Sequence, residues 1–178
     1  VVLATTGIGV GNVEEMVSLM VECYRPDLLI SLGYAGAASK GLRAGDLVLC
    51  SRASFLDDVM KLRPATAGEH EISTDPNLED LAVEAFQLAE LVFHKGGCVT
   101  VTHLVGDPEI KRRIGNQWDV LAIDMEGCWM AQAAASRSLP FLGIRAITDI
   151  VTQRLPDLSG LIDGDGGISV LGSLAHAL

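Results

Sequence analysis

Charged side chains occur where the surrounding sequence predicts a buried strand. Arg145 lies inside the apolar run Pro140–Ile147, and Asp149 follows that run at its carboxyl end. Burying a guanidinium costs several kcal/mol unless the group is paired. Because side chains alternate along a strand, Arg145, Ile147 and Asp149 share one face. The pattern favours either a structural Arg145–Asp149 ion pair or a functional site, and the residues alone weigh the two about equally.

Two more acids, Asp124 and Glu126, close the predicted strand Val120–Ile123 and open a helix. The helix dipole stabilises an acid in the first helical turn, which explains one of the two. The helix dipole does not explain as well why two acids flank Met125, whose side chain is flexible and polarizable. Glu126 and Asp149 are therefore predicted at the same edge of the sheet, where open α/β folds bind their ligands.

The glycine-rich turn Gly7–Gly11 lies between an apolar run and a helix, which allows three interpretations. A nicotinamide dinucleotide site is the weakest, because the spacing is not G-x-G-x-x-G and the second strand ends in Ser31–Tyr34 rather than in an acid. The turn could instead be only a tight strand-to-helix connection. Alternatively, its backbone N–H groups could bind a phosphate or small polar ligand at the helix start.

Composition and charge exclude several classes of protein. Lys+Arg number 13 against 23 Asp+Glu, and the net charge of −10 argues against nucleic acid and anionic membranes as partners. No apolar run approaches the roughly 18 residues of a membrane helix, and we expect no leader. There is no Ser or Cys nucleophile motif, and His70, His94 and His103 lack metal-ligand spacing, so we expect neither metal nor cofactor. Four widely spaced cysteines predict reduced, mostly buried thiols and a cytoplasmic protein.

Apolar runs alternate with helical segments along the chain. Strands are predicted at 1–4, 28–32, 47–50, 98–101, 120–123 and 141–147, and the continuous apolar run 28–32 is typical of a strand buried on both faces. Helices are predicted from Asn12, as N-cap, to Pro26, at 78–93, 109–114 and 125–137, and near the C-terminus, whereas 52–77 is predicted to be a loop. This alternation predicts a single three-layer αβα domain with a mostly parallel sheet.

Five short blocks follow one another in an informative order: Thr6–Gly9, Leu32–Ala37, Gly45–Val48, Ile123–Gly127 and Pro140–Asp149. Each block is weak alone, but the ordered set is specific and spans most of the chain. The chain thereby resembles the nucleoside phosphorylase and nucleosidase superfamily, especially the methylthioadenosine/S-adenosylhomocysteine nucleosidases. The resemblance implies a phosphorylase/hydrolase-like α/β fold with a central mixed, mostly parallel sheet, and a homodimer or larger homo-oligomer.

The resemblance also implies a reaction, the cleavage of the N-glycosidic bond of a purine nucleoside through a transition state similar to a ribosyl cation. It assigns the general acid at purine N7 to Asp149. Binding of the ribose hydroxyls and stabilisation of the developing positive charge fall to Glu126. Arg145 is expected near the attacking water or phosphate, where it would hold Asp149 in place.

Further residues are expected at the substrate by the same resemblance. Met125 should pack against the ribose, and the segment 103–105 should line the base pocket. The predicted substrate-binding residues are Gly9, Tyr34, Ala35, Gly36, His103, Leu104, Val105, Asp124 and Met125.

Three departures from the family pattern refine these expectations. Ser31 and Tyr34 stand where phosphorolytic members carry an arginine and a serine that hold phosphate, which favours hydrolysis. Phosphorolysis and a catalytically impaired nucleoside-binding protein remain alternatives. The family normally begins with an earlier strand and glycine loop, so the single domain 1–178 is expected to lack that strand. The segment 149–158 is more similar to the hopanoid-associated phosphorylases, whose substrate is a purine nucleoside joined to a lipid.

Overall fold

Helices and strands alternate through most of the computed structural model, which describes residues 1–7, 9–61 and 71–156. The helices are α1 (Val10–Tyr24), α2 (Pro76–Leu88), α3 (Pro108–Trp118) and α4 (Gly127–Ala135). The strands are β1 (Leu29–Ala37), β2 (Leu47–Leu56), β3 (Ile72–Ser73), β4 (Phe93–Val101), β5 (Val120–Asp124) and β6 (Phe141–Asp149). The predicted α/β fold is therefore confirmed, and the predicted C-terminal helix lies outside the described residues.

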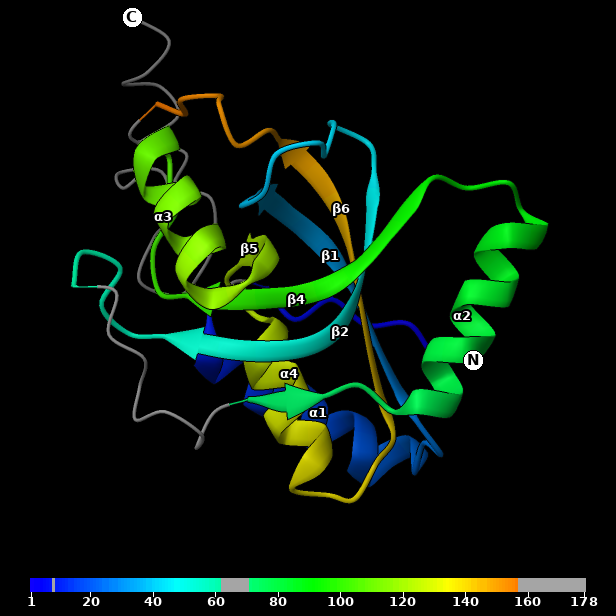
Figure 1. The fold of residues 1–178 in the computed structure, drawn as a ribbon. Coiled ribbons are helices and arrows are strands. Elements are labelled where there is room, and N and C mark those ends of the chain that lie inside the picture. The colour runs from blue at the N-terminus through cyan, green and yellow to red at the C-terminus, as the bar shows by residue number, and fades with distance from the viewer. Residues whose placement is uncertain (8, 62–70, 157–178) are drawn as a thin grey trace, which may run out of the picture.

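The strands form one mixed sheet in the order β3-β2-β4-β5-β1-β6. The long pairings β1–β6 and β2–β4, together with β4–β5, are parallel, whereas β1–β5 and β2–β3 are antiparallel. β2 also pairs with β6 in antiparallel orientation, over Leu47–Cys50. The sheet therefore curls until β2 meets β6, as Figure 1 shows.

Small and aliphatic side chains fill the inside of the curled sheet. All five long strands contribute to this cluster, which contains Ala35, Ala37, Val48, Cys50, Cys98, Ala122 and Ile147. Small residues are needed because side chains from opposite walls of a closed sheet compete for a narrow interior. Three of the four cysteines are buried, as the composition predicts.

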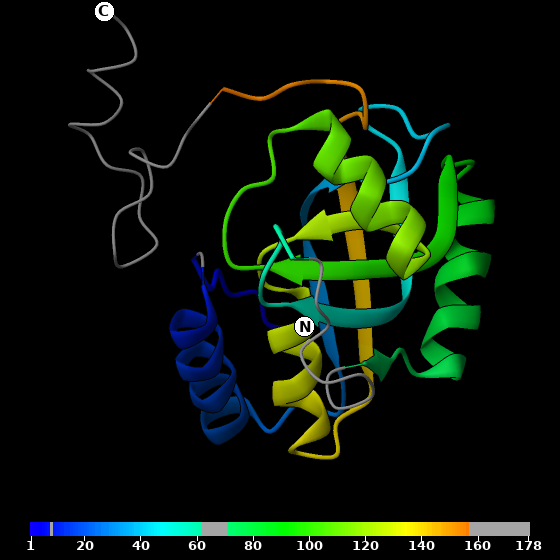
Figure 2. The same cartoon turned by 60° about the vertical axis from the view of Figure 1, so that its left-hand side comes forward.

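Helices pack on both faces of the sheet. Helix α4 packs on β2 and β6 through Ala131, Ala134 and Phe141, and α1 packs against α4. On the opposite side, α2 packs against β2 and β6 through Ala82 and Leu142. Figures 1 and 2 show α1 and α4 together on one side of the sheet and α2 on the other. This arrangement agrees with the predicted three layers.

Local sequence explains where two of the helices begin. Asp75 precedes Pro76, and its side chain accepts hydrogen bonds from the backbone N–H groups of Asn77 (2.9 Å) and Leu78 (3.1 Å). Asp107 precedes Pro108 and caps α3 in the same way, with a 2.7 Å bond from the N–H of Glu109. Aspartate satisfies the free N–H groups, and proline at the first position loses no hydrogen bond.

Two predictions for the amino-terminal region are wrong. Residues 1–4 are exposed and form no strand within the described part of the chain. An apolar run becomes a strand only where another strand is available to pair with its backbone. Helix α1 starts at Val10 with Gly9 at its N-cap, so Asn12 lies inside the helix and does not cap it.

Two further predictions about the strands need correction. β1 is not buried on both faces, because Leu32 and Tyr34 are 68% and 76% exposed. Its apolar composition therefore reports strand propensity rather than two-sided burial. The predicted loop 52–77 contains the second half of β2, all of β3 and the start of α2.

Candidate active site

The sheet register brings Asp124 and Asp149 to either side of Gly36. Gly36 near the end of β1 is paired with Ile123 on β5 and with Asp149 on β6. Asp124 follows Ile123 directly and ends β5. A Cβ atom on Gly36 would lie 3.0 Å from Asp149 Oδ2, so the absence of a side chain leaves room for that carboxylate.

Asp149 is buried and both of its carboxylate oxygens accept hydrogen bonds. Oδ1 accepts from the hydroxyl of Thr148 at 2.9 Å, and Oδ2 accepts from the ammonium of Lys111, with which it forms an ion pair. Lys111 is completely buried in α3. Its ammonium also donates to the carbonyl oxygens of Gln153 at 3.0 Å and Ile150 at 3.5 Å. Lys111 thereby joins α3, the end of β6 and the turn that follows it.

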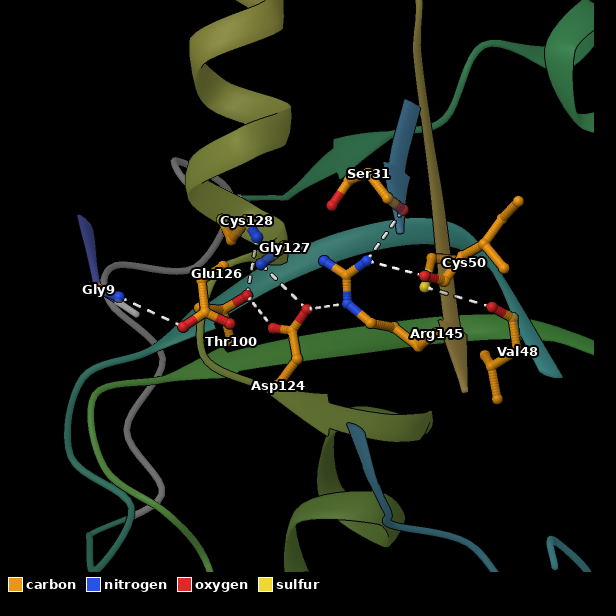
Figure 3. A network of polar contacts seen from close by, with 11 residues as sticks. Gly9, Ser31, Val48, Cys50, Thr100, Asp124, Glu126, Gly127, Cys128 and Arg145 are labelled. Carbon is orange, nitrogen blue, oxygen red and sulfur yellow. Dashed lines mark hydrogen bonds and ion pairs between the residues drawn. The ribbon is translucent and has the colours of Figure 1, made fainter. Parts of the chain in front are cut away.

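Asp124 forms a second buried ion pair, with Arg145 (Figure 3). Arg145 Nε donates to Asp124 Oδ2 at 2.6 Å, and Nη1 donates to the carbonyl oxygens of Ser31 (3.1 Å) and Ile144 (2.9 Å). Asp124 also accepts from the Thr100 hydroxyl at 2.6 Å and the Gly127 N–H at 3.0 Å. This pair ties β1, β4, β5, β6 and the start of α4 together.

The predicted Arg145–Asp149 pair is therefore wrong, because Arg145 binds Asp124 and Asp149 binds Lys111. The two residues do lie on one buried face of β6, as the strand period predicts. However, four residues along a strand span about 13 Å, and side chains on one face stand roughly perpendicular to the sheet instead of reaching along the strand. Sharing a face did not bring them into contact.

Electrostatics keep the Arg145 guanidinium charged. Burial alone would lower the pKa of Arg145, but Asp124 and the nearby thiols of Cys98 and Cys50 raise it above its usual value. Burial also raises the pKa of the Cys128 thiol to about 12, so this thiol at the start of α4 stays protonated. A protonated thiol is a poor nucleophile, which agrees with the absence of a cysteine nucleophile motif.

Glu126 connects α4 with the glycine-rich turn. It is the N-cap residue of α4, one position before the helix begins, and not a residue of the first turn as predicted. Its Oε1 accepts from the Gly9 N–H at 3.3 Å (Figure 3). Burial raises the pKa of the Glu126 carboxyl, and the neighbouring Asp124 raises it further, while the bond from Gly9 opposes the shift. Two segments far apart in the sequence, Gly7–Gly11 and Asp124–Glu126, are thus brought together.

A pocket opens beside Asp149 at this end of the sheet. Its polar lining consists of Asp149, Lys111 and Asp124, and most of the remaining wall is apolar. The apolar residues are Val101, Leu104, Val105, Ile123, Met125 and Leu155, and Gly36 completes the lining. No cluster of metal-ligating side chains occurs in the described part of the chain, and no helix there is long and apolar enough to cross a membrane.

A family model for the phosphorylase superfamily matches residues 1–161. The chain belongs to this superfamily. It is 30% identical over 175 residues to a 5′-methylthioadenosine/S-adenosylhomocysteine nucleosidase of Staphylococcus saprophyticus. The aligned region covers 95% of this chain and 72% of that relative. A nucleosidase of the same name from Bacillus licheniformis is 31% identical over 163 residues, covering 84% of this chain and 68% of the relative.

Solved structures of other phosphorylase superfamily members resemble this fold closely. The Neisseria meningitidis methylthioadenosine/S-adenosylhomocysteine nucleosidase, in complex with methylthio-immucillin-A, gives a TM-score of 0.76 at 27% identity over 84% of this chain and 68% of that one. The Campylobacter jejuni nucleosidase also gives a TM-score of 0.76, at 25% identity over 98% of this chain and 79% of that one. The fold expected from the ordered sequence blocks is confirmed.

Several residues that the superfamily resemblance assigned to substrate do border the pocket, and others lie away from its lining. Gly36, Leu104, Val105, Asp124, Met125 and Asp149 line it, and Gly9 contacts Glu126 instead. Tyr34 and His103 are exposed and Ala35 is buried, and none of these three is among the lining residues. Substrate contacts for these residues stay predictions. The similarity of the segment 149–158 to hopanoid-associated enzymes also stays a prediction, and this segment lies partly outside the described residues.

Sequence reasoning missed four pocket residues: the strand residues Val101 and Ile123, and also Lys111 and Leu155. A usable signal existed for Lys111, because it stands three and four positions before Ile114 and Gly115, which form the buried stripe of α3. Leu155 carried no such signal, since a loop residue acquires its neighbours only from tertiary packing. Its N–H donates to the Gly106 carbonyl at 3.0 Å, which places it at the pocket rim.

Proposed function

We propose that this protein hydrolyses the N-glycosidic bond of an adenosine-type nucleoside. The observation that carries the proposal is a buried aspartate, Asp149, in the wall of an otherwise mostly apolar pocket. A flat purine base fits such a wall, because few polar groups are needed to orient it. The nucleosidase names of the relatives support the same reaction.

Asp149 acts as the general acid in this proposal. Purine is a poor leaving group until N7 receives a proton or a hydrogen bond, because negative charge otherwise builds up on the ring as C1′–N9 breaks. A carboxylic acid at the pocket wall supplies that proton, which is worth typically 10²–10⁴-fold in rate. Leu104, Val105 and Met125 exclude water from the acid and the base.

Glu126 acts on the sugar. Its carboxylate accepts hydrogen bonds from ribose hydroxyls and stabilises the positive charge that develops on the ring. The Gly9 N–H bond fixes one carboxylate oxygen and so limits the orientation of the group. Met125 lies between Asp124 and Glu126 in the sequence and lines the pocket, where it packs against the ribose.

For Arg145 and Asp124 we propose a positioning role rather than contact with the reacting atoms. Their ion pair is almost completely buried, and its hydrogen bonds go to β1, β4, β6 and the α4 N-terminus. It fixes where β5 ends, and hence where Met125 and Glu126 stand. This replaces a role for Arg145 in holding Asp149.

The proposal is tested by measuring free base released from methylthioadenosine, S-adenosylhomocysteine and adenosine, each with and without phosphate. Hydrolysis predicts adenine and a free sugar at a rate independent of phosphate. Turnover that requires phosphate and yields a sugar phosphate would establish phosphorolysis instead. Adenine binding without turnover of any of the three nucleosides would identify a nucleoside-binding protein and overturn the enzymatic proposal.

A homo-oligomer and a cytoplasmic location remain part of this proposal. The exposed apolar side chains of Ile30, Leu32 and Tyr34 on one face of β1 are compatible with a second copy packing there. Light scattering at several protein concentrations measures the oligomeric state, and a monomer at all of them would contradict it. Fractionation of cells that produce the native protein tests the location.

A further inference from the structure

Lys111 is the one lysine of the described residues that is fully buried, and its environment is unusual for an ammonium group. Buried lysines are rare unless they are paired, because removing the charge from water is costly. Here three acceptors match the three N–H donors: Asp149 Oδ2 and the carbonyl oxygens of Gln153 and Ile150. The other charged pair on α3, Arg112 with Glu109, lies at the surface.

The ion pair raises a chemical difficulty for a general acid. An ammonium in contact with a carboxylate stabilises the ionised form of that carboxylate. Asp149 must nevertheless deliver a proton to the purine for its proposed role. The proton therefore has to be available elsewhere in the resting site, and Lys111 is the group that holds one in direct contact with Asp149.

We propose that Lys111 stores the proton that Asp149 passes to the leaving purine. This inference rests on the proposed function and assigns the source of the proton in that reaction. Lys111 acts through Asp149, so it is a positioning residue that also carries a proton rather than a group that touches the base.

The proton and the electrons balance in three steps. An Nζ–H bond of Lys111 breaks as an O–H bond forms on Asp149, which converts the ion pair into a neutral amine and a neutral acid. The O–H bond then breaks as an N7–H bond forms, while the C1′–N9 electron pair moves onto the purine. Water adds to C1′ and loses its proton to solvent, and solvent returns a proton to Lys111 after product release.

The choice of cation at the two buried pairs supports this role. Arginine holds its proton at every working pH, and lysine releases its proton when desolvation favours the neutral form. The chain places arginine at the pair that ties strands together and whose cation is not among the pocket's lining residues, and lysine at the pair of which both members line the pocket.

Other titratable groups near the pair are already accounted for. Asp124 lines the same pocket and is held by Arg145, and Glu126 is bonded to Gly9. At the start of α3, Asp107 forms a 2.8 Å ion pair with the exposed Arg154. A pH effect specific to Lys111 must therefore be separated from these groups by mutation.

The test compares the pH dependence of kcat for the wild type with that for Lys111→Met. Without the stored proton, Asp149 must be protonated from solvent, so activity follows solvent proton concentration. We expect the two activities to converge at the acidic end of the profile. The deficit of the variant should then grow with pH, by up to about tenfold per unit, to about 10²-fold or more. The control is Arg112→Met, which removes the neighbouring cation of α3 and should leave the profile unchanged.

Several outcomes would overturn the inference. A deficit of the same size at every pH would mean that Lys111 only orients Asp149, and an unchanged profile would mean that it does neither. Lys111→Gln, which is polar and smaller than lysine, serves in the same measurement if the methionine variant does not fold, as judged from its melting temperature. If the wild type releases no base from any nucleoside, that result would contradict both the proposed function and this inference. If the wild type is active and the deficit of the Lys111 variant is the same at every pH, that result would contradict the inference alone.

Discussion

Two buried ion pairs lie at the same end of the sheet, yet they are built differently. In the Arg145–Asp124 pair only the aspartate lines the pocket, and its carboxylate accepts from Arg145, Thr100 and Gly127. The Lys111–Asp149 pair borders the pocket, and its carboxylate accepts from Lys111 and Thr148. Both consist of an aspartate at a strand end and a cation almost completely removed from water.

Burial of a charge does not by itself distinguish a structural group from a functional one. Arg145 is the more conspicuous residue in the sequence, because it interrupts an apolar strand, and its partners are backbone and side-chain groups of the scaffold. Lys111 is hidden in a charged helix, and both Lys111 and its partner Asp149 line the pocket, whereas Arg145 does not. Which pair serves catalysis follows from what lies beside it, and mutations can test that division.

The largest effect is expected for Asp149→Asn. The amide keeps the shape of the side chain but cannot transfer a proton, so kcat should fall by about 10²–10⁴-fold. Lys111 loses its carboxylate, so the melting temperature should also decrease. Activity is therefore measured per folded molecule, with free adenine affinity as the control for an intact pocket. A folded variant with nearly wild-type turnover would refute the assignment of Asp149.

The next largest effect is expected for Arg145→Met, and it concerns stability. Removing the guanidinium leaves the fully buried Asp124 carboxylate without its cation, which should lower the free energy of unfolding by about 3–5 kcal/mol. Urea denaturation measures this loss. Molecules that remain folded should lose less turnover than Asp149→Asn does, because Arg145 positions Met125 and Glu126 without contacting the reacting atoms. If their kcat instead fell as far as that of Asp149→Asn, Arg145 would belong to the catalytic machinery and the contrast between the pairs would disappear.

The smallest effect is expected for Glu126→Gln, roughly a hundredfold in turnover, because one charge on the ribose side is lost. Its pH dependence is specific. Since burial raises the pKa of Glu126 above the usual 4.5, wild-type turnover should fall on acidification at a higher pH than an ordinary glutamate would give, and this limb should vanish in the variant.

Stability should change in the opposite direction to turnover over the same pH range. The unfolded chain releases the Glu126 proton before the folded chain does, so the folded state loses stability as pH rises from about 4.5 through the raised pKa. Thermal denaturation at several pH values should show a shallower decline in Glu126→Gln than in the wild type. Equal slopes in both proteins would show that the carboxyl is not perturbed by burial.

Patterns in the sequence were sufficient to predict the class of the fold, and they singled out the two acids that we propose for the site. Alternating apolar runs and amphipathic segments located the long strands and the helices after residue 75, because burial periodicity is a local property. Asp149 and Glu126 were conspicuous because acids at strand ends and helix starts lie where ligands bind. The ordered blocks from Thr6 to Asp149 were enough to identify the superfamily.

Tertiary structure alone decided the partners of those acids. Arg145 and Asp149 share a face of β6, but the curl of the sheet and the β1–β5 register offered Asp124 to the guanidinium instead. Lys111 reached Asp149 because α3 packs on β5, and Leu155 entered the pocket because its backbone bonds to Gly106. A buried charge is satisfied by whichever group is within reach in space, and distances between segments far apart along the chain are set by packing, not by sequence order.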